Sequence, residues 1–454
     1  MADLKSSLHS IQDEALTTLR NVLRLPSVSS DSEKRQALQA CGEALEALLQ
    51  EWEFTTKWID VEGYPCLVAE AGPERGPTVL IYGHYDVQPA LPEDGWTTDP
   101  FEPVVRNGAI VCRGASDDKG QVVAMLYGLE AYRRAYGKFP CRVRVLLEGA
   151  EEIGSPGFEE ALQRNRALVE ADFAVVGDCG RIVPERPGLI CGLRGLAYLE
   201  LTVQGPRADL HSGTFGGTVD NPAQVLCGML AALKDARRKV AVPGFYDDVV
   251  PPTEDELKQL EAVPFDEETY RRSLGVQRLA GEEGYSTLVR RWLRPALDIN
   301  GLRAGHTGEG AKTVLPATAT AKVSVRTVVN QDPDKILSLL EDFFRSLLPE
   351  TCTISFKRYA SAKPVKLDLS GRQAAWVLEA LRRAYGAEPL RVFEGATIPV
   401  VSTFAEMGIT PFPIGFGRID DGAHGPDERF YLDDFTKAIS TTAHLLEVIA
   451  EEQT

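Results

Sequence analysis

Short apolar runs that alternate with amphipathic stretches constrain the fold of this chain more than any other feature. Thr78–Tyr82, Val143–Leu147 and Phe173–Val176 have the composition of fully buried strands, and residues 121–135 and 157–169 between them have helical spacing. Buried strands joined by helices form mostly parallel sheets that helices cover on both faces. The sequence therefore predicts an α/β domain in the first part of the chain.

The pattern changes after about residue 193. Residues 196–203 and 321–328 alternate between apolar and polar side chains, as strands with one exposed face do. Helical stretches at 222–238 and 253–262 lie between these strands, and Asp332-Pro333 is typical of the N-cap and first residue of a helix. This part of the chain is predicted to be a separate α+β domain.

The beginning and the end of the chain belong to one domain in this interpretation. Amphipathic helices are predicted at 6–24, 33–52 and 371–386, and a buried strand at 411–414. A length of 454 residues exceeds one ordinary domain. We therefore expect an α/β domain with a mixed, mostly parallel sheet and an α+β domain inserted into it, with the boundaries 1–193, 194–364 and 365–454.

Composition argues against several classes of function. A net charge of −17 argues against nucleic acid and anionic membranes as partners. The chain has no apolar run of about 18 residues that would predict a membrane span, and its N-terminus lacks the apolar segment of a secretory signal. The eight cysteines are scattered without a CxxC pair, as expected for reduced thiols of a cytoplasmic protein, so a cysteine zinc site is not expected.

Polar segments that suit catalysis follow several of the predicted strands, where ligands bind in open α/β sheets. His84 and Asp86 come directly after the strand Thr78–Tyr82. A carboxylate commonly fixes the second nitrogen of a histidine ligand, and Asp86 suits that role, although the pair is equally typical of an ordinary loop. Asp117 lies in the small-residue loop Arg113–Gly120 before a helix, and taken alone it is more typical of a helix cap than of a ligand.

Glu151 and Glu152 follow another predicted strand. Adjacent carboxylates at the end of a buried strand repel each other unless a cation offsets their charge, and then one can ligate while the other acts as a general base. Asp178 and His424, taken singly, are more typical of structural or surface positions. Together, these segments supply two imidazoles, three carboxylates and one further glutamate, a donor set that suits two divalent ions bridged by a carboxylate.

The order of these motifs resembles that of the M20 metallopeptidase family over nearly the whole chain. The resemblance rests on Tyr82-Gly-His84-Tyr-Asp86-Val-Gln-Pro89, Arg113-Gly-Ala-Ser-Asp117-Asp-Lys-Gly120, Glu148-Gly-Ala-Glu151-Glu152-Ile-Gly-Ser155 and Asp420-Asp-Gly-Ala-His424. Asp178, together with Tyr85 and Gln88, makes the chain more similar to the carnosinase-like dipeptidase branch than to the aminoacylase or desuccinylase branches.

The resemblance implies two divalent metal ions in each subunit. His84 and Asp178 would hold one ion, Glu152 and His424 would hold the other, and Asp117 would bridge both. Histidine and carboxylate ligands suit zinc, manganese or cobalt, and the ligand types do not choose among these metals.

The resemblance also assigns the catalytic roles. Asp86 would orient His84, and Glu151 would be the general base that takes a proton from the metal-bridging water and passes it to the leaving amine. A cis peptide is expected at Asp117-Asp118, because the family tends to have one after the bridging aspartate.

The resemblance also implies that the first and last segments form the catalytic domain, and that the inserted α+β domain is a lid and dimerisation domain that takes part in catalysis. By resemblance, His211 would reach the partner subunit's active site across a homodimer and stabilise the oxyanion. Thr313 and Arg326 match segments that hold the C-terminal carboxylate of the substrate, and Arg326 is free to do so because it points away from the apolar residues of its strand. The substrate-binding segment of the family is matched by Gly395 and Thr397.

The expected activity is hydrolysis of dipeptides or similarly short peptides. The alternative within the family is an N-acyl amino acid amidohydrolase, which shares the metal chemistry and differs in the group on the amino side of the scissile bond. A non-catalytic scaffold would need a missing ligand or base, and none is missing. A nucleotide-binding enzyme would need a GxGxxG motif after an early strand, and Gly213-Thr-Phe-Gly216-Gly217 lacks that spacing.

Overall fold

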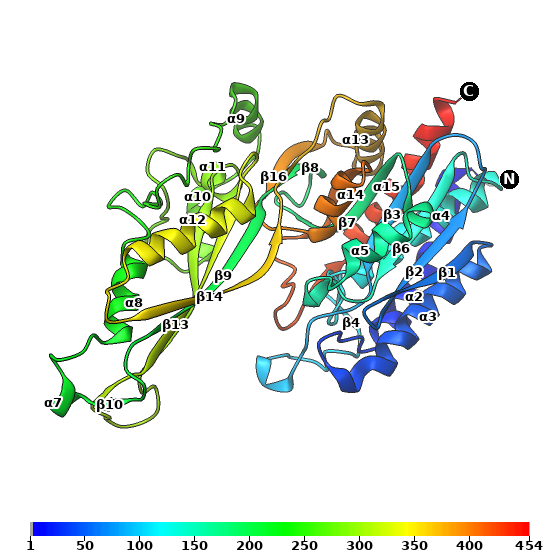
Figure 1. Ribbon diagram of the computed structural model, residues 1–454. Helices are drawn as coiled ribbons and strands as arrows, with labels where there is room; N and C mark the ends of the chain where they lie inside the picture. The colour runs from blue at the N-terminus through cyan, green and yellow to red at the C-terminus, as the bar shows by residue number, and fades with distance from the viewer. Residues whose placement is uncertain (1–2, 454) are drawn as a thin grey trace. The chain divides into compact units, whose positions relative to one another are not determined.

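The computed structural model describes residues 3–453, which form two compact units (Figure 1). The first unit runs to Cys191 and includes Leu367–Val392 and the chain from Pro399 onward. The second unit consists of Gly192–Lys366 and the short segment Phe393–Ile398. The return of residues 393–398 to the second unit was not predicted from the sequence. The role of the second unit as a lid and dimerisation domain stays a prediction.

A nine-stranded sheet contains the predicted buried strands. Its order is β1-β2-β6-β3-β7-β17-β8-β15, and β16 pairs with β8. The central strands β6, β3, β7 and β17 are mutually parallel, whereas the pairs toward both edges are antiparallel, so the sheet is mixed with a parallel centre. The strands are β1 (Thr55–Val61), β2 (Tyr64–Ala71), β3 (Thr78–His84), β6 (Arg142–Glu148), β7 (Phe173–Arg181), β8 (Gly188–Leu193), β15 (Val365–Lys366), β16 (Leu390–Glu394) and β17 (Thr410–Arg418).

Helices cover both faces of this sheet in the first unit, as the apolar strands predict. On β3, Val79 and Ile81 belong to one core with six helices, whereas Tyr82 faces the other way and packs its ring against Phe158 and Phe404. The six helices are α1 (Leu4–Ser10), α2 (Gln12–Leu23), α3 (Arg35–Glu51), α4 (Lys119–Tyr136), α13 (Arg372–Tyr385) and α15 (Leu432–Glu451). The opposite face carries α5 (Phe158–Arg164) and α14 (Pro399–Glu406).

Three predicted helices are shorter than expected. Residues 6–24 form α1 and α2, which meet at Ile11, and residues 157–169 form α5 and α6 (Arg166–Val169), which meet at Asn165. The helix predicted at 222–238 ends at Ala231, because the Asp235 carboxylate accepts hydrogen bonds from two following backbone N–H groups and holds a turn instead.

The second unit is built on a four-stranded antiparallel sheet in the order β11-β13-β9-β14. The alternating apolar residues of β9 and β13 face α8 and α12 and form the core of this unit. Asp332 caps α12 through its side chain, as its sequence predicts. The elements are β9 (Gly195–Gln204), β10 (Leu210–His211), β11 (Ala296–Ala304), β12 (Val314–Leu315), β13 (Thr318–Thr327), β14 (Thr353–Ala362), α7 (Ser212–Phe215), α8 (Pro222–Ala231), α9 (Glu254–Glu261), α10 (Glu267–Ser273), α11 (Thr287–Trp292) and α12 (Pro333–Ser346).

A small three-stranded sheet brings distant segments of the first unit together. It consists of β4 (Val104–Arg106), β5 (Ala109–Val111) and β18 (Arg429–Tyr431), and β18 pairs with β5 in antiparallel register. The loop that follows β5 therefore lies beside the segment that precedes β18. Within residues 3–453, no helix is both long enough and apolar enough to cross a bilayer.

Candidate metal centre

The carboxyl ends of three neighbouring strands deliver the first residues of the site. His84 is the last residue of β3 and pairs in register with Glu148, the last residue of β6, while Asp178 lies within the adjacent strand β7. His84 is fully buried, and its Nε2 atom lies 3.8 Å from Oδ1 of Asp178. The parallel centre of the sheet thus concentrates an imidazole and carboxylates at one edge, where ligands bind in such folds.

Asp117 lies between this edge of the sheet and His424, the histidine near the end of the chain. Its Oδ1 atom lies 3.0 Å from Nε2 of His84, and its Oδ2 atom lies 3.0 Å from Nε2 of His424. The same nitrogen of His424 lies 3.2 Å from Oε2 of Glu152. One carboxylate therefore faces two imidazoles, each of which has a second carboxylate beside it.

The donor atoms form two groups that suit metal ions. His84, Asp118 and Asp178 form one group, and Asp117, Glu152 and His424 form the other, with the atoms of each group within 4.8 Å of one another. Imidazole and carboxylate donors in groups of three suit divalent ions such as zinc or manganese. The residues present therefore fit two divalent ions.

Asp118 is a member of the first group that the sequence did not single out. The interpretation of this loop as an ordinary helix cap is wrong, because Asp118 stands at the N-cap of α4 but makes no side-chain capping bond. Its Oδ2 atom accepts from the backbone N–H of His84 at 3.1 Å, and its buried Oδ1 atom has no hydrogen-bond partner among residues 3–453. The peptide bond between Asp117 and Asp118 is cis, which confirms that prediction.

Asp86 holds two parts of the site at once. Its Oδ1 atom lies 3.3 Å from Nδ1 of His84, and its two carboxylate oxygens accept from the backbone N–H groups of Glu151 and Glu152, both at 3.1 Å. The contact with His84 is the one that the sequence suggested. The two hydrogen bonds to the backbone give Asp86 a second function, which the sequence did not suggest: they fix the turn that carries Glu151 and Glu152.

Glu151 is mostly buried among other acidic groups. Burial, together with the negative charge of Asp178, raises the pKa of Glu151 to about 9. Although burial disfavours its charged form, the carboxylates of Asp117, Asp178 and Asp86 accept hydrogen bonds from His84 and raise its pKa well above the ordinary value. The negative charge of neighbouring carboxylates contributes to both shifts, and divalent cations would offset that contribution.

Two further residues support the candidate ligands, in roles that the sequence did not suggest. Gln88 donates from Nε2 to Oε2 of Glu152 at 2.7 Å and so fixes the orientation of that carboxylate. Glu428 is fully buried and accepts four hydrogen bonds, from Nη1 of Arg113 and from the backbone N–H groups of Gly114, Ser116 and Asp117, at 2.7, 3.0, 2.9 and 3.0 Å. The pairing of β5 with β18 places Glu428 beside the loop that carries Asp117.

The remaining predicted residues lie in the second unit. His211 is exposed, and its Nδ1 atom accepts from the backbone N–H of Gly213 at 3.1 Å. Thr313 is exposed on the neighbouring segment, and its carbonyl oxygen accepts from the N–H of Ser212. The short pairing of β10 with β12 brings these two residues together.

Arg326, Thr397 and Gly395 also lie close together in the second unit. Arg326 donates from Nη1 to Oγ1 of Thr397 at 2.8 Å, and that hydroxyl donates to the carbonyl oxygen of Arg194 at 2.7 Å. Arg194 in turn donates from Nε to the carbonyl oxygen of Gly395 at 3.0 Å. A Cβ atom at Gly395 would lie 2.7 Å from the carbonyl oxygen of Arg291, so glycine is required by the close approach.

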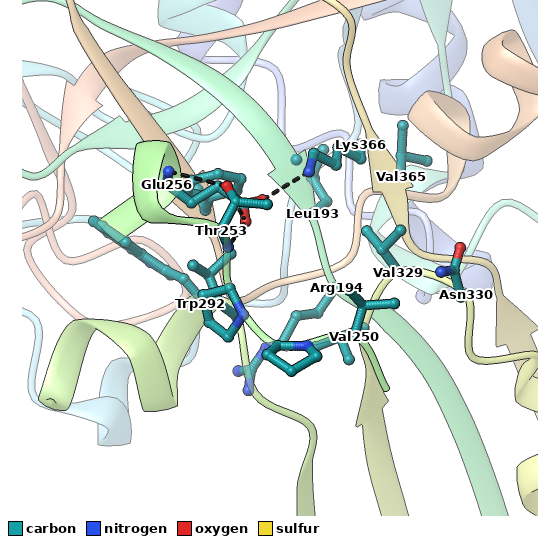
Figure 2. A pocket seen from close by; sticks show the side chains of 16 residues that line it. Leu193, Arg194, Val250, Thr253, Glu256, Trp292, Val329, Asn330, Val365 and Lys366 are labelled. Carbon is teal, nitrogen blue, oxygen red and sulfur yellow. Dashed lines mark hydrogen bonds and ion pairs between the residues drawn. The ribbon is translucent and has the colours of Figure 1, made fainter. Parts of the chain in front are cut away.

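A separate cavity of about 160 Å³ lies in the second unit. Figure 2 shows its lining, which includes Arg194, Trp292 and the ion pair between Lys366 and Glu256 at 2.8 Å. Its walls are largely apolar, and none of the predicted site residues lines it. The chemistry implied by the metal ligands therefore lies elsewhere.

Comparison with known proteins agrees with this geometry. A model of peptidase family M20/M25/M40 matches residues 80–448. The Cys-Gly metallodipeptidase dug1 of Schizosaccharomyces pombe is 33% identical over 94% of this chain and 94% of its own length. The Beta-Ala-His dipeptidase of Rattus norvegicus is 32% identical over 80% of this chain and 76% of its own length. The M20 family metallo-carboxypeptidase Sso-CP2 of Sulfolobus solfataricus superposes with a TM-score of 0.88, at 30% identity over 96% of this chain and 99% of that one.

A mixed α/β sheet with paired imidazole and carboxylate groups at the ends of its parallel strands defines a metal-dependent hydrolase. The family match covers most of the chain and includes every strand of the parallel centre, from Leu80 onward. The chain belongs to peptidase family M20/M25/M40, in its dipeptidase branch, and is a metallopeptidase.

Proposed function

We propose that this protein hydrolyses dipeptides with two divalent ions, zinc or manganese, held by His84, Asp117, Glu152, Asp178 and His424. The observation that carries the proposal is the carboxylate of Asp117, whose two oxygens each lie 3.0 Å from the imidazole of a different group. When bound, two divalent ions would polarise the scissile carbonyl and lower the pKa of a water molecule.

The chain's own residues supply the proton transfer. Glu151 is the general base: its carboxylate lies among the acidic groups of the site, takes the proton that a water molecule loses, and passes that proton to the leaving amine. Asp86 fixes the direction of the His84 ring and, through the two backbone N–H groups that it accepts, the turn that carries Glu151.

Residues of the second unit bind the substrate in this proposal. Arg326 binds the C-terminal carboxylate of the peptide, and its guanidinium is oriented by the hydrogen bond that it donates to the hydroxyl of Thr397. Thr313, Gly395 and Thr397 position the peptide beside it. His211 stabilises the developing oxyanion in the partner subunit of a homodimer, which requires a histidine that is exposed within its own chain, as His211 is.

The substitution Glu151→Gln tests the catalytic assignment. It should lower turnover by at least about 100-fold, while two metal ions per chain still bind. Glu159→Gln, which alters an exposed glutamate of α5, is the matched control and should leave turnover unchanged. Retained activity in Glu151→Gln would remove this residue from the mechanism.

A substrate panel tests the class of reaction. Protein reloaded with manganese or zinc should cleave free dipeptides and spare their N-acetylated forms, and Arg326→Ala should reduce cleavage of free dipeptides far more than of C-terminal amides. Cleavage of N-acetylated forms alone would indicate an N-acyl amino acid amidohydrolase, which the names of the relatives do not favour.

Complementation tests the homodimer. A mixture of His211→Ala and Glu151→Gln chains should regain activity in heterodimers, because one of the two composite sites would then carry both intact residues. A proven heterodimer without activity would place the action of His211 within one chain.

A further inference from the structure

The second unit contains a larger cavity whose lining is strongly basic. This cavity, of about 560 Å³, is lined by seven lysine and arginine side chains and by only two carboxylates, those of Glu282 and Asp298. The whole chain has a net charge of −17, so a local excess of positive charge is opposite in sign to the rest of the protein. We call this cavity the arginine basin.

The two carboxylates do not neutralise the arginine basin. Glu282 binds Arg294 through two bonds, at 2.9 and 2.7 Å, and Asp298 lies 3.9 Å from Lys234. The other five basic side chains have no ion-pair partner among the residues that the structure describes: Arg194, Arg238, Arg278, Arg290 and Arg291. Five of the basic side chains that line the cavity are therefore without an ion-pair partner in the part of the chain that the structure describes.

Neutral contacts hold several of these guanidinium groups in place. Arg194 donates to the carbonyl oxygens of Gly395 and Arg294, and Arg290 donates to the carbonyl oxygen of Glu282 at 2.9 Å. Arg291 lies over the ring of Tyr270 at 5.2 Å and over that of Trp292 at 5.8 Å. Such contacts orient a cation and leave its charge available, which is the arrangement of a preformed anion site.

We propose that the arginine basin binds a small anionic group through its carboxylate or phosphate oxygens. Planar guanidinium groups match both kinds of oxygen, and a cavity lined by charges of one sign attracts ions of the opposite sign. Two sources can supply the anion. One is a free anion in solution; the other, which rests on the proposed function, is the side-chain carboxylate of a dipeptide that ends in Asp or Glu.

The second source follows from the neighbourhood of Arg326. Thr397 accepts a hydrogen bond from Arg326 and donates one to the carbonyl oxygen of Arg194, whose guanidinium lines the arginine basin. Ala296, which also lines the basin, pairs in register with Arg326 across β11 and β13. A peptide whose C-terminal carboxylate is held by Arg326 would therefore have its last side chain close to these cations.

Calorimetric titration of the metal-loaded protein with inorganic phosphate tests the shared chemistry. Binding should weaken at high salt, and Arg290→Gln and Arg291→Gln should each raise the Kd roughly 10-fold, because each removes one charged contact to the anion. Lys258→Gln, which removes an exposed lysine of α9 outside the basin, is the matched control. Two independent arginine variants guard against a folding defect in either one.

Peptide selectivity separates the two sources. If the substrate supplies the anion, the ratio of kcat/KM for Ala-Glu over Ala-Gln should fall roughly 10-fold in Arg291→Gln, mainly through KM. Phosphate binding that depends on both arginines, with an unchanged ratio, identifies a free anion as the ligand.

The outcomes for the two proposals differ. A protein that cleaves Ala-Gln but shows neither arginine-dependent phosphate binding nor a change in the ratio overturns the anion site while the proposed function stands. A protein that binds phosphate through both arginines but cleaves no dipeptide supports the anion site and refutes the proposed function.

Discussion

The substitution Glu428→Gln should disrupt the metal centre without touching any proposed ligand. Oε2 of Glu428 accepts from Nη1 of Arg113 and the N–H of Gly114, and Oε1 accepts from the N–H groups of Ser116 and Asp117. The amide nitrogen of a glutamine cannot accept hydrogen bonds. In either orientation of the amide, two of the four donors therefore lose their acceptor and face the NH2 group of the glutamine, which is itself a donor.

The expected loss of stability follows from these contacts. Arg113 and Glu428 are 2% and 0% exposed at their side chains, so the substitution removes the charged partner of a fully buried arginine. Breaking a buried ion pair on one side costs about 3–5 kcal/mol, and the unpaired donors are part of that cost. For a unit of this size, such a change lowers Tm by on the order of 10 °C.

Scanning calorimetry and metal analysis together provide the assay. Glu428→Gln should lower Tm by that amount and weaken metal binding, since the loop that carries Asp117 loses its anchor. Asp427→Asn is the control, because the neighbouring pair with Arg106 is partly exposed and should contribute about 1 kcal/mol or less. A Glu428→Gln protein with normal Tm and normal metal content would falsify the idea that this buried carboxylate positions Asp117.

Three further predictions concern the same unit. Asp86→Asn should lower metal affinity roughly 10- to 100-fold in competition with a chelator, because it weakens the contact with His84 and the hydrogen bond to the backbone of Glu151. Unchanged affinity would count against a positioning role for Asp86. Removal of the metal ions should lower Tm, and reloading at 100-fold over Kd should restore about 3 kcal/mol of stability, whereas Asp117→Asn should show no such recovery. Burial raises the pKa of Asp421 to about 6, above its ordinary value, so the wild type should lose stability relative to Asp421→Asn as pH rises from about 4 to about 6. Urea unfolding of both metal-free proteins across this pH range measures the difference, and free energies of unfolding that change in parallel would contradict the prediction.

The parallel centre of the sheet was predictable because its signal is local. Strands such as β3 and β6 are continuous apolar runs, and their periodicity with the helices between them specifies the layers. The edge strands β1 and β2 were missed, because β1 mixes polar and apolar residues along a half-exposed face. The turn between them, Glu62-Gly63 with φ angles of 50° and 84°, was a usable signal for a hairpin.

The proposed ligands were predictable for a different reason, since the resemblance located them before any distance was known. Glu428 could not be found in that way, because its burial depends on Arg113, which lies 315 positions earlier in the chain. Asp118 was not singled out, because aspartate before a helix is usually a cap, and only the structure shows that its carboxylate turns to the backbone of His84 instead. Tertiary contacts of this kind have no local signature.

The six residues Phe393–Ile398 belong to the second unit although the chain on both sides of them belongs to the first. During synthesis, the second unit therefore lacks a piece until residue 398 has left the ribosome, well after its main segment ends at Lys366. The two units therefore cannot complete their folding strictly one after the other. A truncated chain that ends at Lys366 would lack Gly395 and Thr397. Attempts to express the second unit alone should graft residues 393–398 onto it through a short linker.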